Sequence, residues 1–369
     1  MSRLLFYLNT QAITPIQDIG NKINVIGHVA SGFKEMQRVR FAILLVMILV
    51  TAGHNAYSLR LVKLWSYTNS TMGFLFNRIV FSDSGKYLGV AWGRCMVVFD
   101  VQSGKIILRK CLNPMDTYIV NDASAYGNLI GFVVYHPSYN KGFVLLYDVL
   151  TNQTKTYYVG TYYDRALKLT KSGFVACNDF CALFKYNGKR VWVVQIGNAL
   201  DNMFVDTQGL ALYYPYLYVS RYNFPCLCIV NINSGKILKW FSWIDLDVGD
   251  KLDVCGTYLA MSDSSRVTIY LILNPFNPSK IYEIHGLPRY SFYHVNSIAF
   301  SPDCNYIAVA DESQFLQIYY INGTLAYVKY YGEYTNGIPT RVDAVAWHDN
   351  LLAVGIGSNA TLILYKVER

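Results

Sequence analysis

Residues 77–111, NRIVFSDSGKYLGVAWGRCMVVFDVQSGKIILRKC, decide the fold of this chain. The stretch contains four short apolar or alternating runs, which are Ile79–Phe81, Tyr87–Trp92, Met96–Phe99 and Lys105–Leu108. Runs of this length, broken by Gly, Ser and Asp, are typical of consecutive antiparallel hairpins. A four-stranded meander of this size is too small to be stable alone. If it recurs at a period of roughly 40 residues, it predicts a β-propeller.

The meander does recur along the chain. The plainest second copy is Ser297–Tyr331, which repeats the order of apolar run, Ser/Asp turn, apolar run, polar turn, aromatic run, Gly turn and apolar run. In addition, Asn233-Ser234-Gly235 repeats the Gln102-Ser103-Gly104 turn before a Lys-Ile strand. The sequence thus predicts seven units, at Asn77–Cys111, Thr117–Val159, Arg165–Ile196, Met203–Trp243, Lys251–Ile284, Ser297–Tyr331 and Arg341–Val367.

The last unit has only three strands, whereas an unpartnered alternating run, Leu59–Tyr67, precedes the first unit. This run can supply the missing outer strand beside Ala360–Val367, and such closure removes exposed sheet edges. The predicted fold is therefore all-β: a seven-bladed β-propeller of four-stranded antiparallel blades, closed by an N-terminal strand and preceded by one short hydrophobic helix.

Several units carry motifs of a known repeat family. These are Phe-Ser-Asp-Ser-Gly-Lys-Tyr-Leu at Phe81–Leu88, Phe-Ser-Pro-Asp at Phe300–Asp303, and the strand endings Phe99-Asp100 and Tyr147-Asp148. They resemble WD-repeat and YVTN-type β-propeller repeats over about Leu59–Arg369. The Gly-His pair of the WD repeat is absent, and its Trp-Asp ending is only approximated. The resemblance implies the architecture and carries no activity, because propellers host many unrelated functions.

Composition suits short, half-buried strands. The hydrophobic fraction is 53%, the chain has 32 Tyr, and only 15% of its residues are charged. This composition is one we associate with thermophilic archaea and their viruses. Of the net charge of +8, residues 1–56 contribute five basic against two acidic residues, and the remaining basic residues are scattered. Because nucleic-acid binding requires a clustered basic face, the sequence argues against it. Attraction to an acidic surface is the better interpretation.

The segment Met36–Gly53 indicates location. Arg38 and Arg40 precede an apolar run from Phe41 to Val50, which is followed by small residues. This order is typical of a secretory signal peptide, and the run is short for a spanning helix. Residues 1–35 are then either an untranslated or a cytoplasmic extension. We expect residues 36–56 to be a cleaved signal peptide or a membrane anchor using residues 39–56, and residues 57–369 to form the propeller. The prediction is an extracellular protein or a membrane-anchored one that faces outside.

All eight cysteines lie in the propeller. If Gln102–Gly104 forms a three-residue hairpin loop, counting outward places Cys95 opposite Cys111, within disulfide range. Two buried thiols are the alternative. In an exported protein, Asn-x-Ser/Thr triplets can also carry glycans. They begin at Asn69, Asn152, Asn322 and Asn359.

The sequence contains no Gly-rich phosphate loop, His-Glu-x-x-His helix or Gly-x-Ser-x-Gly elbow. We therefore assign no catalytic, cofactor-binding or metal residue and expect no cofactor. The favoured function is a non-enzymatic binding or structural module of a cell envelope or virus-like particle, whose partner is another envelope or particle protein or a glycan. The alternative is an extracytoplasmic propeller enzyme, either a lactonase-like hydrolase or a quinoprotein-type oxidoreductase. That alternative predicts carboxylates or histidines that converge at the channel.

Overall fold

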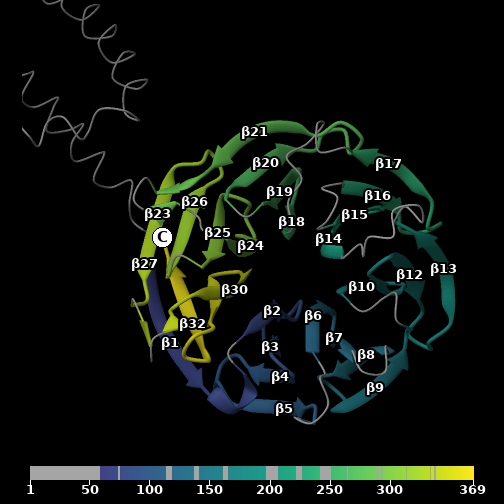
Figure 1. The fold of residues 1–369 in the computed structure, drawn as a ribbon, viewed down its shortest axis with the longest axis horizontal. Helices are drawn as coiled ribbons and strands as arrows, with labels where there is room; N and C mark the ends of the chain where they lie inside the picture. Colours follow the sequence, from purple (N-terminus) through teal and green to yellow (C-terminus); the bar gives the residue numbers. More distant parts are fainter. Residues whose placement is uncertain are drawn as a thin grey trace, which may run out of the picture. The chain divides into compact units, whose positions relative to one another are not determined.

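A computed structural model shows a β-propeller at Ser58–Arg369 (Figure 1). The structure describes residues 59–73, 75–113, 119–136, 141–160, 165–196, 207–221, 227–241, 251–263, 265–287, 290–291, 294–312, 314–332, 334–335 and 338–369. The predicted N-terminal extension, the predicted signal peptide or anchor, and the short hydrophobic helix lie outside these residues.

The predicted seven four-stranded antiparallel blades are confirmed. The first four blades are β2 (Phe76–Phe81), β3 (Tyr87–Trp92), β4 (Cys95–Asp100) and β5 (Ile106–Cys111); β6 (Ile119–Tyr126), β7 (Leu129–His136), β8 (Lys141–Asp148) and β9 (Gln153–Tyr158); β10 (Ala166–Thr170), β11 (Gly173–Cys177), β12 (Phe180–Phe184) and β13 (Arg190–Gln195); and β14 (Thr207–Tyr213), β15 (Tyr216–Arg221), β16 (Leu227–Asn231) and β17 (Ile237–Phe241).

The remaining blades are β18 (Lys251–Cys255), β19 (Tyr258–Ser262), β20 (Val267–Leu271) and β21 (Ser279–Ile284); β24 (Val295–Phe300), β25 (Tyr306–Asp311), β26 (Phe315–Tyr320) and β27 (Leu325–Tyr330); and β30 (Val342–His348), β31 (Leu351–Ile356) and β32 (Thr361–Glu368) with β1 (Arg60–Thr68). Three small elements were not predicted. These are the short ribbons β22 (Gly286–Leu287) with β23 (Tyr290–Ser291) and β28 (Tyr334–Thr335) with β29 (Ile338–Pro339), and the 3-10 turn η1 (Ser70–Met72).

The predicted closure strand is confirmed. β1 pairs antiparallel with β32, from Arg60 opposite Glu368 to Thr68 opposite Thr361, and becomes the outer strand of blade 7. Figure 1 shows β1 on the rim beside β32, whereas β2, β6, β10 and the other first strands surround the central channel. Because the two ends of the domain share one sheet, blade 7 cannot form until both are present.

Burial across a blade explains the different strand patterns in the sequence. The second and third strands lie between two neighbouring blades, so both of their faces are covered; β3 and β4 are buried at nearly every position. The outer strand β5 instead alternates between half-buried and exposed residues. Within the described residues, seven hydrophobic clusters are found, one at each blade-to-blade interface. The core is therefore a ring of interfaces.

Tryptophan side chains on two outer strands bind to the next blade. Trp65 of β1 donates its Nε1–H to the Val101 carbonyl of blade 1 at 2.8 Å, and its ring covers Gly104. Trp192 of β13 does the same on blade 4, donating to the Ile232 carbonyl at 2.8 Å and covering Gly235. The repeated Asn/Gln-Ser-Gly turn therefore has a second purpose, because a side chain at its glycine would meet the neighbouring tryptophan.

We predict that Gly235→Ala destabilises the protein more than Gly127→Ala. Both glycines have positive φ, +70° and +59°, so alanine strains the backbone at either site by about 1 kcal/mol. At Gly235 a Cβ would also lie 2.6 Å from the Trp192 ring, whereas at Gly127 it would meet nothing within 4 Å. Overpacking adds about 1–3 kcal/mol at Gly235 only. Chemical denaturation of the two variants measures the difference, and equal losses would show that Trp192 does not require the glycine.

Candidate functional site

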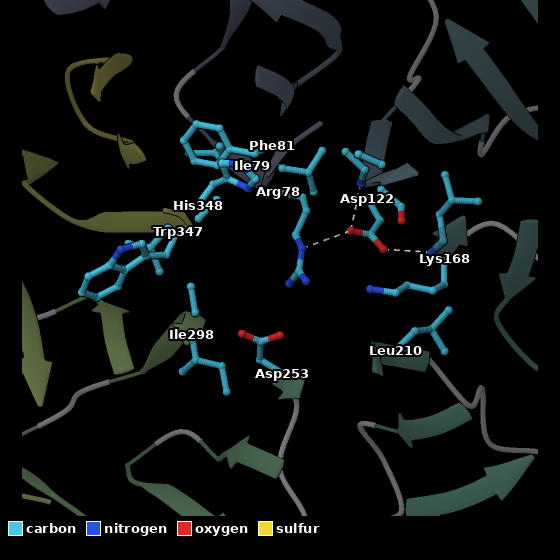
Figure 2. A pocket seen from close by; sticks show the side chains of 18 of the residues that line it. Arg78, Ile79, Phe81, Asp122, Lys168, Leu210, Asp253, Ile298, Trp347 and His348 are labelled. Carbon is cyan, nitrogen blue, oxygen red and sulfur yellow. Dashed lines mark hydrogen bonds and ion pairs between the residues drawn. The ribbon is translucent and has the colours of Figure 1, made fainter. Parts of the chain in front are cut away.

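The described part of the channel holds a cavity of about 220 Å³ (Figure 2). Its walls are the first strands of all seven blades, and it extends from mid-channel to the ends of β2 and β30, where Phe81 and His348 stack with ring centroids 5.6 Å apart. Blades 6 and 7 contribute small residues such as Ala299 and Ala346. Blades 1, 2, 3 and 5 contribute charges. No spacing in the sequence indicated that these strands would converge.

Four charged side chains, which we call the channel quartet, extend into this cavity. They are Arg78 from β2, Asp122 from β6, Lys168 from β10 and Asp253 from β18 (Figure 2). The direct ion pair among them joins Arg78 Nε to Asp122 Oδ1 at 3.7 Å. The quartet carries two positive and two negative formal charges. Sequence reasoning missed it, because each member is an isolated residue on a different blade.

The two carboxylates of the quartet also join neighbouring blades. Asp122 Oδ2 accepts the Leu167 N–H of blade 3 at 2.8 Å, and its Oδ1 accepts the Ala123 N–H at 2.9 Å. Asp253 Oδ2 accepts the Phe300 N–H of blade 6 at 2.8 Å, and its Oδ1 accepts the Val254 N–H at 2.9 Å. Every oxygen of both carboxylates thus accepts a backbone donor. A structural use accounts for these carboxylates without any chemistry.

The two cations of the quartet, Arg78 and Lys168, make fewer contacts than its carboxylates. Within the described residues, Lys168 makes neither an ion pair nor a hydrogen bond through its ammonium, and Arg78 has the single contact to Asp122. The Arg78 and Asp122 side chains are 29% and 17% exposed, yet protein surrounds them on every side of the channel. Burial therefore lowers the pKa of Lys168, although Asp253 and Asp122 oppose the shift. Burial likewise raises the pKa of Asp122 and of Asp253, with Arg78 acting in the opposite direction.

Asp343 makes a similar connection where the ring closes. Its Oδ2 accepts the Phe76 N–H of blade 1 at 3.0 Å, and its Oδ1 accepts from Arg341 Nε at 2.6 Å. Arg341 also contacts Glu312 at 3.1 Å. Burial raises the pKa of Asp343 to about 6, against the opposing effects of Arg341 and the Phe76 N–H. Three interfaces thus use an aspartate of one first strand to hold the next first strand.

One face of the propeller carries tight turns, and we call it the short-turn face. It is formed by the turns between first and second strands and between third and fourth strands, at 82–86, 101–105, 127–128, 149–152, 171–172, 185–189, 214–215, 232–236, 256–257, 272–278, 301–305, 321–324 and 349–350. Its turn tips hold the three most exposed large apolar side chains of the described residues: Leu150, Tyr214 and Leu273, at 69%, 71% and 76%.

The turns of blades 3 and 4 on this face are basic. The segments 171–172, 185–189, 214–215 and 232–236 contain Lys171, Lys185, Lys189 and Lys236, all exposed, and no Asp or Glu. None of the four ammonium groups makes an ion pair with the part of the protein that the structure describes. Together with Leu150 of blade 2 and Tyr214 of blade 4, these lysines form what we call the basic sector.

The structure places Cys95 opposite Cys111, but by a different route from the predicted hairpin count. The two residues are partners in the β4–β5 register, and the structure joins their sulfurs in a disulfide. The loop is longer than the predicted three residues, since the Asp100 N–H bonds to the Lys105 carbonyl. A bulge between Val98 and Phe99 then restores the expected register.

Two further disulfides were not predicted. Cys177 pairs with Cys181 across the β11–β12 hairpin, and Cys255 of blade 5 pairs with Cys304 of blade 6. Cys228 is buried in the interface between blades 3 and 4. The spacing of Cys177 and Cys181 around a two-residue turn could have indicated the first pair. No sequence signal could have indicated the second, because its partners lie in different blades.

The proposed glycan acceptors occupy turns where predicted. Asn152 and Asn322 are exposed and Asn359 is half-buried. Asn69 is the N-cap of η1, where its Oδ1 accepts the Thr71 N–H at 3.0 Å and its Nδ2 donates to the Tyr67 hydroxyl at 3.1 Å. Modification of these residues remains a prediction, and Asn69 is the least available of them.

Within the described residues, no group of three or more His, Cys, Asp and Glu side chains is arranged to hold a metal ion. The described residues likewise include no helix long and apolar enough to cross a membrane.

Comparison with known proteins shows the fold. No protein-family profile matches the sequence, and no curated protein matches it. Among solved structures, the chain is similar to the β-propeller domain of Cps50 (Swd1) from Myceliophteria thermophila, with a TM-score of 0.65 and 13% identity, covering 84% of this chain and 100% of that one. A chain of the mitotic checkpoint complex is similar at the same TM-score and identity, covering 84% and 95%. Both neighbours are WD40 propellers.

We predict that the contribution of Asp343 to the free energy of unfolding decreases as pH rises. Its pKa in the folded protein, about 6, exceeds the carboxyl's ordinary value of 3.8, so the folded state favours the neutral carboxyl. This contribution is therefore fully present below about pH 4 and is lost as pH rises through about 6. Asp343→Asn removes this titration. The unfolding free energy of wild type minus that of Asp343→Asn should decrease from about pH 4 to about pH 7.

Asp303 provides the opposite control. Burial raises its pKa, but hydrogen bonds from Ser301, Asn305 and Arg369 outweigh burial and lower it to about 2. Its stabilisation is present above the ordinary 3.8 and is lost as pH falls towards 2. The wild-type advantage over Asp303→Asn should thus shrink at low pH. If the Asp343→Asn difference followed this direction instead, the ion pair with Arg341 would outweigh burial.

Proposed function

We propose that this chain is a non-enzymatic, exported binding module that holds an acidic partner, an envelope or particle protein or an acidic glycan, on the basic sector of its short-turn face. The observation that carries the proposal is the combination, on one sector, of four exposed lysines without counter-charges and two highly exposed apolar side chains. Binding surfaces commonly combine an apolar anchor with charges that steer the partner.

The geometry of the propeller supports this use. Each tight turn of the short-turn face is continuous with a second or third strand, and neighbouring blades bury those strands on both faces. Hydrogen bonds also hold the turn tips. Asp148 Oδ1, for example, accepts the Leu150 N–H at 2.9 Å, and the Tyr214 hydroxyl donates to Asn233 at 3.2 Å. A preorganised surface loses little conformational entropy on binding. Solved propellers of this fold include chains of multiprotein complexes, such as the mitotic checkpoint complex.

Export is supported by the order of charged, apolar and small residues at Met36–Gly53 and by the three disulfides. Disulfides persist mainly in oxidising compartments. N-terminal sequencing of the protein from its native host tests this part. A start near His54, or a membrane-bound chain that retains residues 39–56, supports export; an intact chain in the soluble cytosol overturns it.

We predict that charge reversal in the basic sector weakens binding to envelopes isolated from the host. The triple variant Lys185→Glu, Lys189→Glu, Tyr214→Ser should bind about tenfold more weakly or worse, because it removes attraction and an apolar anchor. The matched control, Lys110→Glu with Lys155→Glu, reverses two exposed lysines on the outer strands β5 and β9. Co-sedimentation over a salt series measures both. Equal weakening in both variants, or none in either, would contradict the use of this face.

We also predict unequal contributions from the disulfides. Cys255–Cys304 spans a sequence separation of 49 residues and Cys177–Cys181 one of 4. In the chain-entropy model their loops contribute about 4 and about 2 kcal/mol. Replacing Cys255 and Cys304 by Ser should therefore cost more stability than replacing Cys177 and Cys181. The gap should close in reducing buffer; a gap that persists there would show that packing, not cross-linking, causes it.

The enzyme alternative predicted carboxylates converging at the channel, and Asp122 and Asp253 do converge there. It remains the second candidate on that observation. Turnover of a lactone or an alcohol that is abolished by Asp253→Asn, in a variant that still folds, would favour it over the binding module.

A further inference from the structure

The channel quartet has unused hydrogen-bonding capacity of both kinds. On the donor side, the Lys168 ammonium and the terminal nitrogens of Arg78 have no hydrogen-bond partner among the described residues. On the acceptor side, each oxygen of Asp122 and Asp253 accepts one backbone N–H, and a carboxylate oxygen can accept two hydrogen bonds. Donors and acceptors therefore both face the same cavity.

The charges of the quartet select what can bind. Its formal charges sum to zero, and Asp83 adds one further carboxylate to the lining of the cavity. A simple anion attracted by Arg78 and Lys168 would therefore be repelled by the aspartates. A simple cation meets the converse problem. A molecule with a carboxylate at one end and an ammonium group at the other can place each charge beside its opposite. Electrostatic complementarity thus favours a ligand of zero net charge that carries both signs.

The cavity has room for such a ligand. Its volume of about 220 Å³ is more than ten times the roughly 10–15 Å³ that one water molecule needs in this measure. The sides formed by blades 6 and 7 present Ala299 and Ala346, which leave room for a short apolar substituent. A small zwitterion fits this space.

Structure alone does not account for Lys168. The aspartates of the quartet hold neighbouring blades together, whereas Lys168 is half-buried, joins no blade to another and extends into the cavity. Its ammonium is therefore available to a ligand in the channel. We propose that the channel binds one small zwitterion, of which a free amino acid is the simplest example, with its carboxylate on Lys168 and Arg78 and its ammonium group on Asp253.

Equilibrium dialysis of the full chain against a mixture of the protein-forming amino acids at millimolar concentration tests this inference. At least one amino acid should be retained at one equivalent per chain. Lys168→Met should reduce retention about tenfold or more while melting near the wild-type temperature, because the Lys168 ammonium makes no ion pair or hydrogen bond with the described residues. The matched control, Lys155→Met, changes an exposed lysine on the outer strand β9, away from the channel and from the basic sector, and should retain the ligand.

Competition by small ions that carry a single charge tests whether both charges of the ligand are needed. Acetate and ethylammonium each carry only one of the two charges, so neither should displace the retained amino acid at comparable concentration. Retention of no amino acid, equal retention by Lys168→Met and wild type, or full displacement by acetate would each overturn the inference. None of these outcomes bears on the proposed binding of an acidic partner by the basic sector. That proposal is tested separately, by the binding of envelopes to variants outside the channel.

Discussion

The pairing of β1 with β32 is the constraint on which the rest of the structure depends. Each blade buries its second and third strands only because another blade covers each side, and a row of blades would leave two open ends. Closure supplies the missing neighbours: Phe76 of β2 lies in the cluster between blades 7 and 1. The ring therefore converts seven marginal sheets into one cooperative unit, because each interface depends on the presence of the next.

Closure of the ring also determines which side chains can line the channel. The first strands converge, and their lining combines small residues such as Ala123, Gly209 and Ala346 with the charged side chains of the channel quartet. Polar atoms of these strands still need partners, and Asp122, Asp253 and Asp343 satisfy backbone donors of the next blade. Asp122 and Asp253, which line the cavity, also contribute to the electrostatic field inside it. The aspartates that join neighbouring blades thus also place negative charges in the cavity, and Lys168 and Arg78 add positive charges beside them.

The fold could be predicted from the sequence to a large extent because its signals are local. Strand length, turn chemistry and the repeat of about 40 residues all come from contiguous residues, and the unpaired run at Leu59–Tyr67 was enough to predict closure. The Cys95–Cys111 register followed from hairpin counting, although a bulge compensated for the longer loop. The candidate sites could not be predicted in the same way. Arg78, Asp122, Lys168 and Asp253 are isolated residues in four different blades, and Cys255 and Cys304 lie in two.

The sequence by itself determined that seven four-stranded units form, where their turns lie and how the chain closes, because β-meander formation depends on interactions within some 35 residues. Only the tertiary structure decided which residues of separate blades meet. The channel quartet, the aspartate links between first strands, the tryptophans over Gly104 and Gly235, and the basic sector all arise from one geometric fact. In a closed ring, equivalent positions of successive repeats are brought together, and the sequence pattern records each position without recording its neighbours.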